Sequence, residues 1–457
     1  MRKLFGTDGI RGLAGEYPLN EHTTFAIGQA LGQHLLKVRP HARVVIGQDT
    51  RQSSEWIANS VARGLMSLGI GIESAGVMTT PGVAYLARTG DFAAGIVVSA
   101  SHNPWQDNGI KVFGHDGYKL ADEIELEIER EIFAHLEENG AAEHVAEIRT
   151  LPGNSSLRES YIEWLVYSVT EDLSNLKVMV DCANGAATPI AHEVFRRCGV
   201  DAEFINDVPD GRNINLNCGA LHPELIASRV QQGNSESHLK RYALGITFDG
   251  DADRALFCDD EGKIVNGDAV LLLAARSMKQ QGTLTNNVVV ATTMSNMGLE
   301  IALRHSGIDM LRAPVGDKYV LEEMQKSGAV LSGEQSGHII FRDGDATTGD
   351  GLLTAIRVMA KMSRTEHTLA ELVADLKVFP QTIRNIRVFE KKPFEQVPEI
   401  AHAIRTAETE LDGDGRIVVR YSGTEALARV MVEAESEQKM RRLTDMVADA
   451  IQKTLGS

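Results

Sequence analysis

The hydrophobic positions of this chain repeat one arrangement of strand and helix three times. Short β-branched runs at Val44–Ile46, Val178–Val180 and Val288–Val290 each lead into a stretch with apolar residues at helical spacing. Each helical stretch ends at a glycine, and another apolar strand follows. Strands that alternate with helices of this length are typical of βαβ units. The pattern therefore predicts three related α/β domains.

The chain after residue 376 follows a different pattern. Three short apolar segments indicate strands and two amphipathic stretches indicate helices, which favours a small sheet with helices on one face. The expected strands are Ile386–Phe389, Arg416–Arg420 and Ala428–Val432, and the expected helices lie near Val397–Leu411 and Glu437–Leu455.

A linker is expected at Val378–Gln381, because Pro380 ends the preceding helix and favours extended chain. We therefore expect three α/β domains followed by a smaller α+β domain. Their expected bounds are 1–150, 151–255, 256–376 and 377–457.

Composition indicates an ordinary globular protein with several domains, since 43% of the 457 residues are hydrophobic and 24% are charged. The four cysteines are isolated and form no CxxC pair, so we expect neither structural zinc nor a disulfide framework. A reducing cytoplasm is the expected location. The cysteines are Cys182, Cys198, Cys218 and Cys258.

The charge balance argues against two classes of partner. The formal net charge is −17, from 46 basic and 63 acidic residues, so we expect no binding to nucleic acid or to anionic membranes. Apolar runs such as Ala269–Ala275 are far shorter than the ~20 residues that span a bilayer. The basic start Met1–Gly12 runs into glycines and an aspartate, so we expect no signal peptide.

The first candidate for chemistry is the loop Ser99–Pro104, which contains Ser101, His102 and Asn103 and follows the apolar strand Ala94–Val98. A strand that runs into Asn-Pro forms a turn that can hold a serine hydroxyl out of the sheet. A solvent-exposed turn without function explains the segment equally well. No GxSxG sequence lies nearby, which disfavours a hydrolase triad.

The second candidate is Asp249-Gly250-Asp251-Ala252-Asp253-Arg254, between two expected strands. Carboxylates at alternate positions of a tight loop can converge on one hard divalent cation. An EF-hand needs glycine at position six and glutamate at position twelve, where this chain has Arg254 and Asp260. The remaining alternative is a solvated acidic turn.

Two further loops carry polar groups. Gly333–His338 places acidic, amide, hydroxyl and imidazole groups between glycines, which suits recognition of sugar hydroxyls, although a flexible turn explains it as well. Arg420–Glu425, with Arg429 shortly after, suits a phosphate, and the alternative is an ordinary strand-to-helix turn. No GxxxxGK[ST] sequence occurs, which disfavours a P-loop NTPase.

In this order and at these distances, the four loops resemble those of the α-D-phosphohexomutase superfamily over essentially the whole chain. The resemblance implies four domains around one central cleft. It implies that Ser101 carries phosphate as phosphoserine. It also implies that Mg²⁺ is held by Asp249, Asp251 and Asp253, with a phosphoserine oxygen as the fourth ligand.

The resemblance also implies which residues contact the substrate. Glu334 and Ser336 would hold the sugar hydroxyls, and Arg254 would help to hold phosphate. The phosphate-binding loop would contribute Arg420, Ser422, Gly423, Thr424 and Arg429.

Four more residues are expected at the reacting centre. Arg11 would stabilise the phosphoserine or the developing charge. Lys111 and His338 are the candidates for general acid and base. His102 either contacts the phosphate or braces the turn.

Finer details resemble the phosphoglucosamine mutase branch of the superfamily. The segments that match are Phe5–Gly12, Asn213-Ile214-Asn215, Cys218-Gly219, His222-Pro223-Glu224 and Val315–Val320. Two positions depart from it, because Ala220-Leu221 replaces the usual Ser-Thr and Glu425-Ala426 replaces the usual Glu-Pro. The first change could affect the substrate or an interface, and the second loosens the phosphate loop. Neither removes a catalytic group.

The resemblance implies an isomerase that interconverts glucosamine 6-phosphate and glucosamine 1-phosphate through phosphoserine and a 1,6-bisphosphate, supplying UDP-N-acetylglucosamine and peptidoglycan precursor synthesis. Glucosamine or glucose 1,6-bisphosphate would be the activator, and a homodimer is expected from the resemblance alone. The alternatives are a phosphoglucomutase/phosphomannomutase of broad specificity, a metal-dependent sugar phosphatase and a non-catalytic sugar-phosphate sensor.

Overall fold

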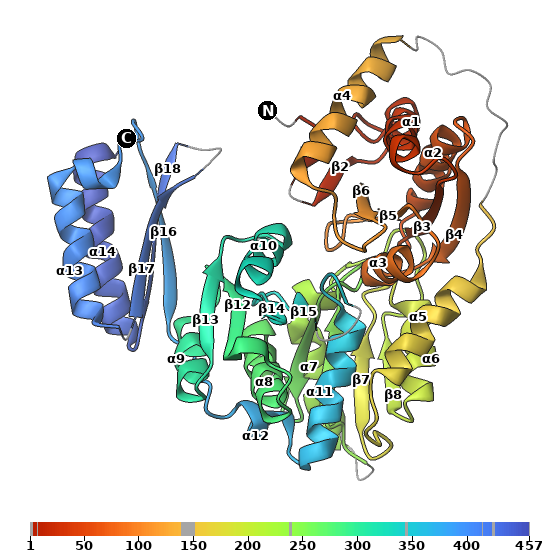
Figure 1. Cartoon of the computed structure of the whole chain (residues 1–457). Coiled ribbons are helices and arrows are strands. Elements are labelled where there is room, and N and C mark those ends of the chain that lie inside the picture. The colour runs from red at the N-terminus through yellow and green to blue at the C-terminus, as the bar shows by residue number, and fades with distance from the viewer. Residues whose placement is uncertain are drawn as a thin grey trace. The chain divides into compact units, whose positions relative to one another are not determined.

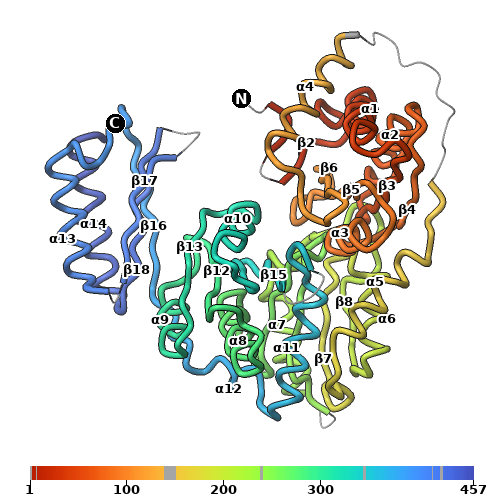
Figure 2. Tube along the Cα trace, viewed as in Figure 1, coloured from red at the N-terminus to blue at the C-terminus, as the bar shows by residue number. Residues whose placement is uncertain are grey.

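The computed structural model describes residues 3–6, 8–138, 151–236, 240–342, 346–413, 415–422 and 426–456. The chain divides into two compact units, which are Met1–Met294 with Met310–Val373, and Ser295–Asp309 with Ala374–Ser457. The path through them can be followed by colour from the N-terminus to the C-terminus (Figures 1 and 2).

The first sheet is built on a repeated unit of strands and helices, which we call the first repeat. It comprises β3 (Arg43–Gln48), α2 (Ser54–Met66), β4 (Gly71–Val77), α3 (Thr80–Thr89), β5 (Ala94–Val98) and β6 (Asp107–Gly114). The sheet continues beyond β6 into two short strands, and two long helices flank it. These elements are β1 (Phe5–Gly6), β2 (Gly9–Leu13), α1 (Glu21–Val38) and α4 (Asp122–Glu138).

The second repeat follows α5 (Ser155–Tyr167). It comprises β7 (Lys177–Asp181), α6 (Thr188–Arg197), β8 (Asp201–Ile205), the 3₁₀ turn η1 (Gly219–Leu221), α7 (Pro223–Glu236), β9 (Leu244–Phe248) and β10 (Ala255–Asp259). A short edge strand, β11 (Ile264–Val265), completes this sheet.

The third repeat follows α8 (Gly267–Gln280) and the 3₁₀ turn η2 (Thr285–Asn287). It comprises β12 (Val288–Thr292), α9 (Met297–His305), β13 (Asp309–Ala313), α10 (Asp317–Ser327), β14 (Leu331–Gly333) and β15 (Ile339–Phe341). Two helices come after it, α11 (Gly351–Thr365) and α12 (Leu369–Val373).

The three repeats share one strand order. Across the sheets the strands lie β6-β5-β3-β4, β10-β9-β7-β8 and β15-β14-β12-β13, so chain order reads 4-3-1-2 in each. Strands 1 and 3 pair in parallel, and strand 4 runs antiparallel to strand 3. The three related α/β domains expected from the sequence are confirmed.

Central strands are covered on both faces, which explains their continuous apolar sequence. In β5, Ile96 and Val98 belong to a core cluster that includes Ile27 of α1 and Val61 of α2. A Cβ built on Gly95, on the opposite face, would lie 3.0 Å from side-chain atoms of α3. All five residues of β5 and all five of β9 are buried.

The expected boundary between residues 255 and 256 falls at the first residue of β10. That strand pairs with β9 along its whole length, so a boundary there would divide the second sheet. We propose instead that the second domain ends after β11, near Val265, because β11 pairs with β10.

The smaller unit contains an antiparallel sheet of order β16-β18-β17, formed by β16 (Gln381–Arg387), β17 (Gly415–Tyr421) and β18 (Leu427–Ala434). Helices α13 (Pro398–Leu411) and α14 (Glu437–Leu455) pack on one face, and η3 (Phe394–Gln396) precedes α13. The α+β arrangement is as expected, but β16 begins at Gln381 rather than Ile386. Its first two residues are polar and half-buried and the next three are exposed, so no alternation of apolar and polar positions marks the start of the strand in the sequence.

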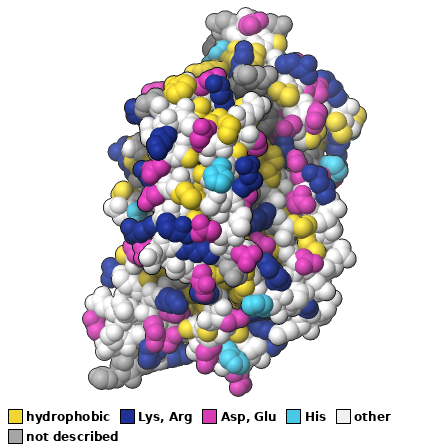
Figure 3. All heavy atoms as spheres, turned by 90° about the vertical axis from the view of Figure 1, so that its left-hand side faces the viewer, with side chains coloured by type: hydrophobic (Ala, Val, Ile, Leu, Met, Phe, Trp, Pro, Cys, Tyr) yellow, Lys and Arg dark blue, Asp and Glu magenta, His cyan; other side chains and the backbone are white. Residues whose placement is uncertain are grey.

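The surface in Figure 3 carries basic and acidic side chains side by side, with hydrophobic side chains scattered among them. Several of the charges in the smaller unit form ion pairs, such as Arg384 with Asp445 at 2.7 Å. Within the described part of the chain, no helix has the length and apolar character needed to cross a membrane.

Candidate active site

Three of the motif loops occupy the same place in their repeats. Each connects the third strand of a repeat to the fourth, at residues 99–106, 249–254 and 334–338. The loops also meet in space. Ser101 Oγ donates a hydrogen bond to Asp249 Oδ2 at 2.6 Å, and His338 Nδ1 lies 3.7 Å from Asp253 Oδ1. The repeated topology therefore brings the three motifs into one site.

Ser101 is held in an unusual backbone conformation at this site. Its φ is +52°, in the left-handed region that non-glycine residues rarely adopt, and only 1% of its surface is exposed. Its backbone N–H donates to Ser99 Oγ at 2.9 Å, and its Oγ lies 3.2 Å from His102 Nδ1. The alternative of a solvent-exposed turn is wrong, because the hydroxyl is buried against the carboxylate loop.

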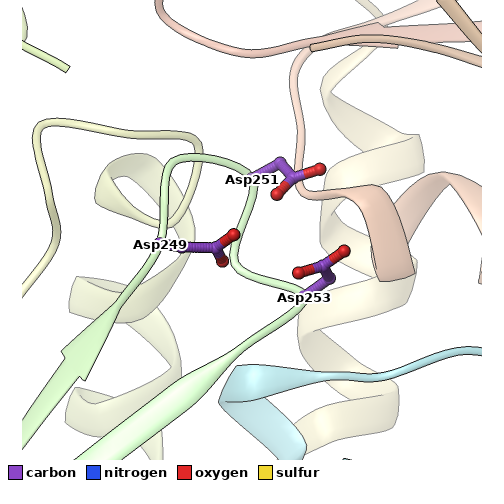
Figure 4. A group of neighbouring side chains, drawn as sticks. All are labelled: Asp249, Asp251 and Asp253. Carbon is purple, nitrogen blue, oxygen red and sulfur yellow. The ribbon is translucent and has the colours of Figure 1, made fainter. Parts of the chain in front are cut away.

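The aspartate loop brings three carboxylates together between β9 and β10 (Figure 4). One oxygen of each, from Asp249, Asp251 and Asp253, lies within 4.8 Å of the others. All three residues are buried, so the alternative of a solvated acidic turn is wrong as well.

The carboxylate oxygens fit a hard cation. Asp251 Oδ1 and Asp253 Oδ1 are buried and have no hydrogen-bond partner among the described residues. Burial raises the pKa of Asp249 well above its usual value, and the charges of Asp253 and Asp251 add to this rise. Mg²⁺ takes oxygen ligands from carboxylates and phosphates, so these residues suit it.

Lys111 on β6 supplies a buried positive charge beside this loop. Its Nζ lies 2.9 Å from Asp251, 3.1 Å from Asp8 and 3.7 Å from Asp253. Burial lowers the pKa of Lys111, but the three carboxylates outweigh burial and the net direction is upward. The side chain is therefore a charged ammonium group, and it donates a hydrogen bond to Asp251 Oδ2.

His338 faces the carboxylate loop from the third repeat. Its Nε2 accepts a hydrogen bond from the Gly349 N–H at 3.2 Å, which leaves the Nδ1 proton directed toward Asp253. Burial lowers the pKa of His338, whereas Asp253 raises it, and the net direction is upward. Burial also acts to raise the pKa of Asp253, but Lys111 and His338 reverse it and hold that pKa low.

A cavity of about 410 Å³ lies beside these groups. This volume is within the ~300–1,000 Å³ typical of small-molecule sites. Glu334 lines it and accepts a hydrogen bond from Ser336 Oγ at 3.1 Å. Five more of the expected residues contribute to the wall, namely Arg11, His102, Asp253, Arg254 and His338.

Four family models match successive parts of the chain. They describe domains I, II and III and the C-terminal domain of phosphoglucomutase/phosphomannomutase, and they match residues 2–139, 159–262, 266–379 and 384–450. The chain belongs to the phosphoglucomutase/phosphomannomutase family. The resemblance found in the sequence is confirmed.

Curated relatives of this family match the chain from end to end. A phosphoglucosamine mutase of Koribacter versatilis is 63% identical over 458 residues, covering 100% of this chain and 98% of the relative. A phosphoglucosamine mutase of Solibacter usitatus is 49% identical over 455 residues, with 100% and 99% covered.

Solved structures share the fold. A phosphoglucomutase/phosphomannomutase family protein of Burkholderia thailandensis matches with a TM-score of 0.78 and 23% identity, covering 99% of this chain and 98% of its own. An Aspergillus fumigatus N-acetylphosphoglucosamine mutase, solved with GlcNAc-6P and magnesium, matches with a TM-score of 0.64 and 18% identity, covering 99% and 96%.

The fourth family motif lies in the smaller unit. Arg420 of β17 stands directly opposite Arg429 of β18 in the antiparallel register. The Ser422 N–H donates to the Leu427 carbonyl at 2.8 Å and closes the hairpin. Gly423, Thr424 and Glu425 lie outside the described residues.

Several polar residues at the site were given no role by the sequence. The carboxylate of Asp8 forms ion pairs with Arg11 and Lys119 as well as with Lys111. Burial acts to raise the pKa of Asp8, but Lys111, Lys119 and Arg11 hold it well below its usual value. The sequence signal for a role of Asp8 is that it is the only carboxylate among the basic and glycine residues of Phe5–Gly12. Two further residues, Arg51 and Asn215, contact the serine loop.

Proposed function

We propose that the chain interconverts glucosamine 6-phosphate and glucosamine 1-phosphate, the reaction named for the curated relatives that it resembles. The observation that carries the proposal is the contact between Ser101 Oγ and Asp249 inside a cluster of three carboxylates, beside a cavity lined by Arg11, Arg254 and Glu334. The product would supply UDP-N-acetylglucosamine synthesis.

Ser101 would be the phosphate carrier. In its phosphorylated form it donates the phosphoryl group to O6 of glucosamine 1-phosphate or to O1 of glucosamine 6-phosphate. Either transfer yields the 1,6-bisphosphate and a free serine hydroxyl. The other phosphoryl group of the bisphosphate then returns to Ser101, so that phosphate and protons balance over the cycle. A trace of glucosamine or glucose 1,6-bisphosphate would restore any enzyme that loses its phosphate.

Asp249, Asp251 and Asp253 would hold Mg²⁺ together with a phosphoserine oxygen. The metal would neutralise charge that develops on the transferring phosphoryl group. Arg254 is placed to contribute positive charge from the same loop, and its backbone N–H donates to Asp249 Oδ1 at 3.2 Å. Arg11, which lies on β2 of the first sheet and is paired with Asp8, would also contribute positive charge.

Proton transfer is assigned to Lys111 and His338. The attacking sugar hydroxyl must lose a proton, and the departing serine oxygen must gain one. The three carboxylates that surround Lys111 keep it protonated, so it cannot serve as the base, and we assign it as the proton donor. To accept a proton from the sugar hydroxyl, His338 would do so at Nε2 in place of the hydrogen bond from the Gly349 N–H, and Asp253 would stabilise the resulting charge.

Substrate contacts are assigned to two loops. Glu334 and Ser336 would bind the sugar hydroxyls, and their mutual hydrogen bond orients the Glu334 carboxylate. The hairpin of the smaller unit would bind the phosphate that is not being transferred, through Arg420, Ser422, Gly423, Thr424 and Arg429. A cytoplasmic location and a homodimer stay predictions from the family resemblance.

The deciding test is a comparison of kcat/KM for glucosamine 6-phosphate, glucose 1-phosphate and mannose 1-phosphate, with Mg²⁺ and trace bisphosphate. We expect a preference for the amino sugar of about a hundredfold, which corresponds to roughly 2.7 kcal/mol of transition-state discrimination. Similar values for all three would assign the chain to a phosphoglucomutase/phosphomannomutase of broad specificity. Steady release of inorganic phosphate would instead indicate a phosphatase.

A further inference from the structure

Two backbone carbonyls of the loop that carries Ser101 accept hydrogen bonds from side chains of two different repeats. The Ser101 carbonyl accepts from Arg51 Nη2 at 3.0 Å and from Asn215 Nδ2 at 2.9 Å. The Asn103 carbonyl accepts from the same two atoms, at 2.6 Å and 3.2 Å. Both donors therefore bridge the ends of the Ser101–Asn103 segment.

Arg51 is a rigid donor. Its side chain is fully buried and is paired with the fully buried Asp49, which also accepts from Ser54 Oγ at 2.6 Å and from the Arg51 N–H at 3.0 Å. A guanidinium group presents several N–H donors in one plane, so a single Arg can hold two carbonyls at once. The Asp49 pair fixes that plane against the serine loop.

Asn215 donates to the same two carbonyls from the second repeat. It has a positive φ of +57°, and its own N–H donates to the Ala183 carbonyl at 2.9 Å, so its backbone is anchored in that repeat. A Cβ built on Gly250 would lie 2.5 Å from the Ser101 carbonyl oxygen and 2.8 Å from Asn215 Nδ2. The metal loop, the serine loop and Asn215 therefore meet at one crowded point.

We infer that Arg51 and Asn215 are positioning residues that hold Ser101 in its left-handed conformation and so aim its phosphoryl group at the metal loop. A residue in a sparsely populated backbone region persists only when its surroundings hold it there. The four hydrogen bonds to the flanking carbonyls provide that constraint. The inference rests on the proposed role of Ser101 and assigns a role to part of the Asn213–Asn215 motif.

The consequence concerns rate more than binding. Phosphoryl transfer depends on the alignment of the reacting atoms, and a displacement of about 1 Å can reduce the rate by about a hundredfold. Neither Arg51 nor Asn215 lines the cavity, so the affinity for the sugar phosphate should be preserved. Removal of either hydrogen-bond donor is therefore expected to lower kcat and to leave KM unchanged.

The test is the variant Asn215→Ala, with Asn234→Ala as the matched control. Asn234 lies in the same repeat and also donates from Nδ2 to two carbonyls, those of Tyr242 at 3.0 Å and Asp260 at 2.8 Å, but it belongs to α7. We expect Asn215→Ala to lower kcat about 10- to 100-fold, with KM for glucosamine 6-phosphate changed less than about twofold. Asn234→Ala should lower thermal stability without this loss of kcat.

The Arg51→Lys variant gives a second measurement, since it keeps the charge beside Asp49 but loses the planar pair of donors. It should also lower kcat selectively. Combined with Asn215→Ala, its effect should be non-additive because both residues hold the same carbonyls. Thermal unfolding of each variant separates a loss of rate from a loss of folded protein.

A phosphoserine readout separates this inference from the proposed function. Mass spectrometry of Ser101 after incubation with glucose 1,6-bisphosphate should show phosphorylation in the wild type and slower phosphate exchange in Asn215→Ala. If the wild type phosphorylates Ser101 and Asn215→Ala matches its kcat, or if both asparagine variants lose kcat alike, the positioning role is wrong. If the wild type never phosphorylates Ser101, the proposed function fails.

Discussion

Ser101 Oγ and Asp249 Oδ2 lie 2.6 Å apart, although 148 positions separate the two residues in the sequence. Ser101 belongs to the first repeat and Asp249 to the second. The hydroxyl therefore reaches the carboxylate loop only because the two repeats pack at equivalent loops. Changes at this junction are expected to affect the reaction before they affect the fold.

Replacement of Ser101 by alanine is expected to abolish mutase turnover. The variant removes the oxygen that would carry phosphate, and alanine loses the hydrogen bonds of this hydroxyl with Asp249 and His102, each worth about 1 kcal/mol. The melting temperature should therefore change little. Turnover of glucosamine 6-phosphate should be measured beside thermal unfolding, with the exposed Ser156→Ala as the control. Wild-type turnover in Ser101→Ala would contradict the phosphoserine mechanism.

Gly250→Ala is expected to reduce activity at least tenfold through misalignment. The added Cβ would come within 2.5 Å of the Ser101 carbonyl oxygen, so the serine loop or the metal loop must shift. Gly153→Ala is the control, because a Cβ there would meet only ordinary contacts at 3.8 Å. The activity and the melting temperature of both variants should be measured, to separate misalignment of the site from loss of folded protein. If Gly250→Ala is fully active, the two loops are less tightly packed in solution.

Removal of divalent metal is expected to abolish turnover and leave the protein folded. Without a cation, Asp251 still has hydrogen bonds from Lys111 at 2.9 Å and Thr80 Oγ1 at 2.6 Å, so the loop keeps much of its support. Activity should vanish with EDTA and return with Mg²⁺, while circular dichroism stays constant. An enzyme that turns over in EDTA would show that the three carboxylates have another role.

Much of the fold could be predicted because its central strands and amphipathic helices carry strong local patterns. The continuous apolar run Ala94–Val98 became β5, and the expected helix Glu437–Leu455 is α14, which begins after the N-cap Ser436. β16 was placed five residues too late because exposed polar residues such as Arg384 and Asn385 interrupt its apolar signal. A strand is predicted less well from its sequence when exposed charged side chains obscure the alternation of apolar and polar positions.

The residues that brace the site could not be found in this way. Asp49 and Arg51 follow a strand and have the local sequence of an exposed turn, yet both side chains are fully buried. Their partners, Ser99 and the carbonyls of Ser101 and Asn103, lie about 50 positions away in the sequence. A buried ion pair depends on which loops pack together, and a local pattern contains no information on that.

A buried carboxylate near the metal loop gives the last prediction. Tyr161 Oη donates to Asp350 Oδ2 at 2.7 Å, and Asp350 Oδ1 accepts the Leu353 N–H at 2.9 Å as the N-cap of α11. The next residue, Gly351, donates its N–H to the Ala252 carbonyl of the metal loop at 3.0 Å. Burial raises the pKa of Asp350 to about 6, against the hydrogen bonds that lower it.

This rise sets the sign of a pH effect on stability. The folded state binds the Asp350 proton more tightly than the unfolded state, so this group favours folding below pH 4 and the benefit is lost as the pH rises toward about 6. The change from 3.8 to about 6 corresponds to on the order of 3 kcal/mol. Asp350→Asn keeps the N-cap and removes the charge. The melting temperature of the variant minus that of the wild type should therefore increase as the pH rises from 4 to 7.

Asp172→Asn serves as the control of opposite sign. The hydrogen bonds from Ser174 lower the pKa of Asp172, so its contribution is present above pH 4 and is lost as the pH falls. Melting temperatures of the wild type and both variants should be compared at pH 4 and pH 7, a range over which the difference for Asp172→Asn should stay nearly constant because its change lies below pH 4. A difference between wild type and Asp350→Asn that does not change with pH would mean that Asp350 is ionised across this range. The Tyr161 hydroxyl and the helix N-terminus would then compensate fully for burial of the charge.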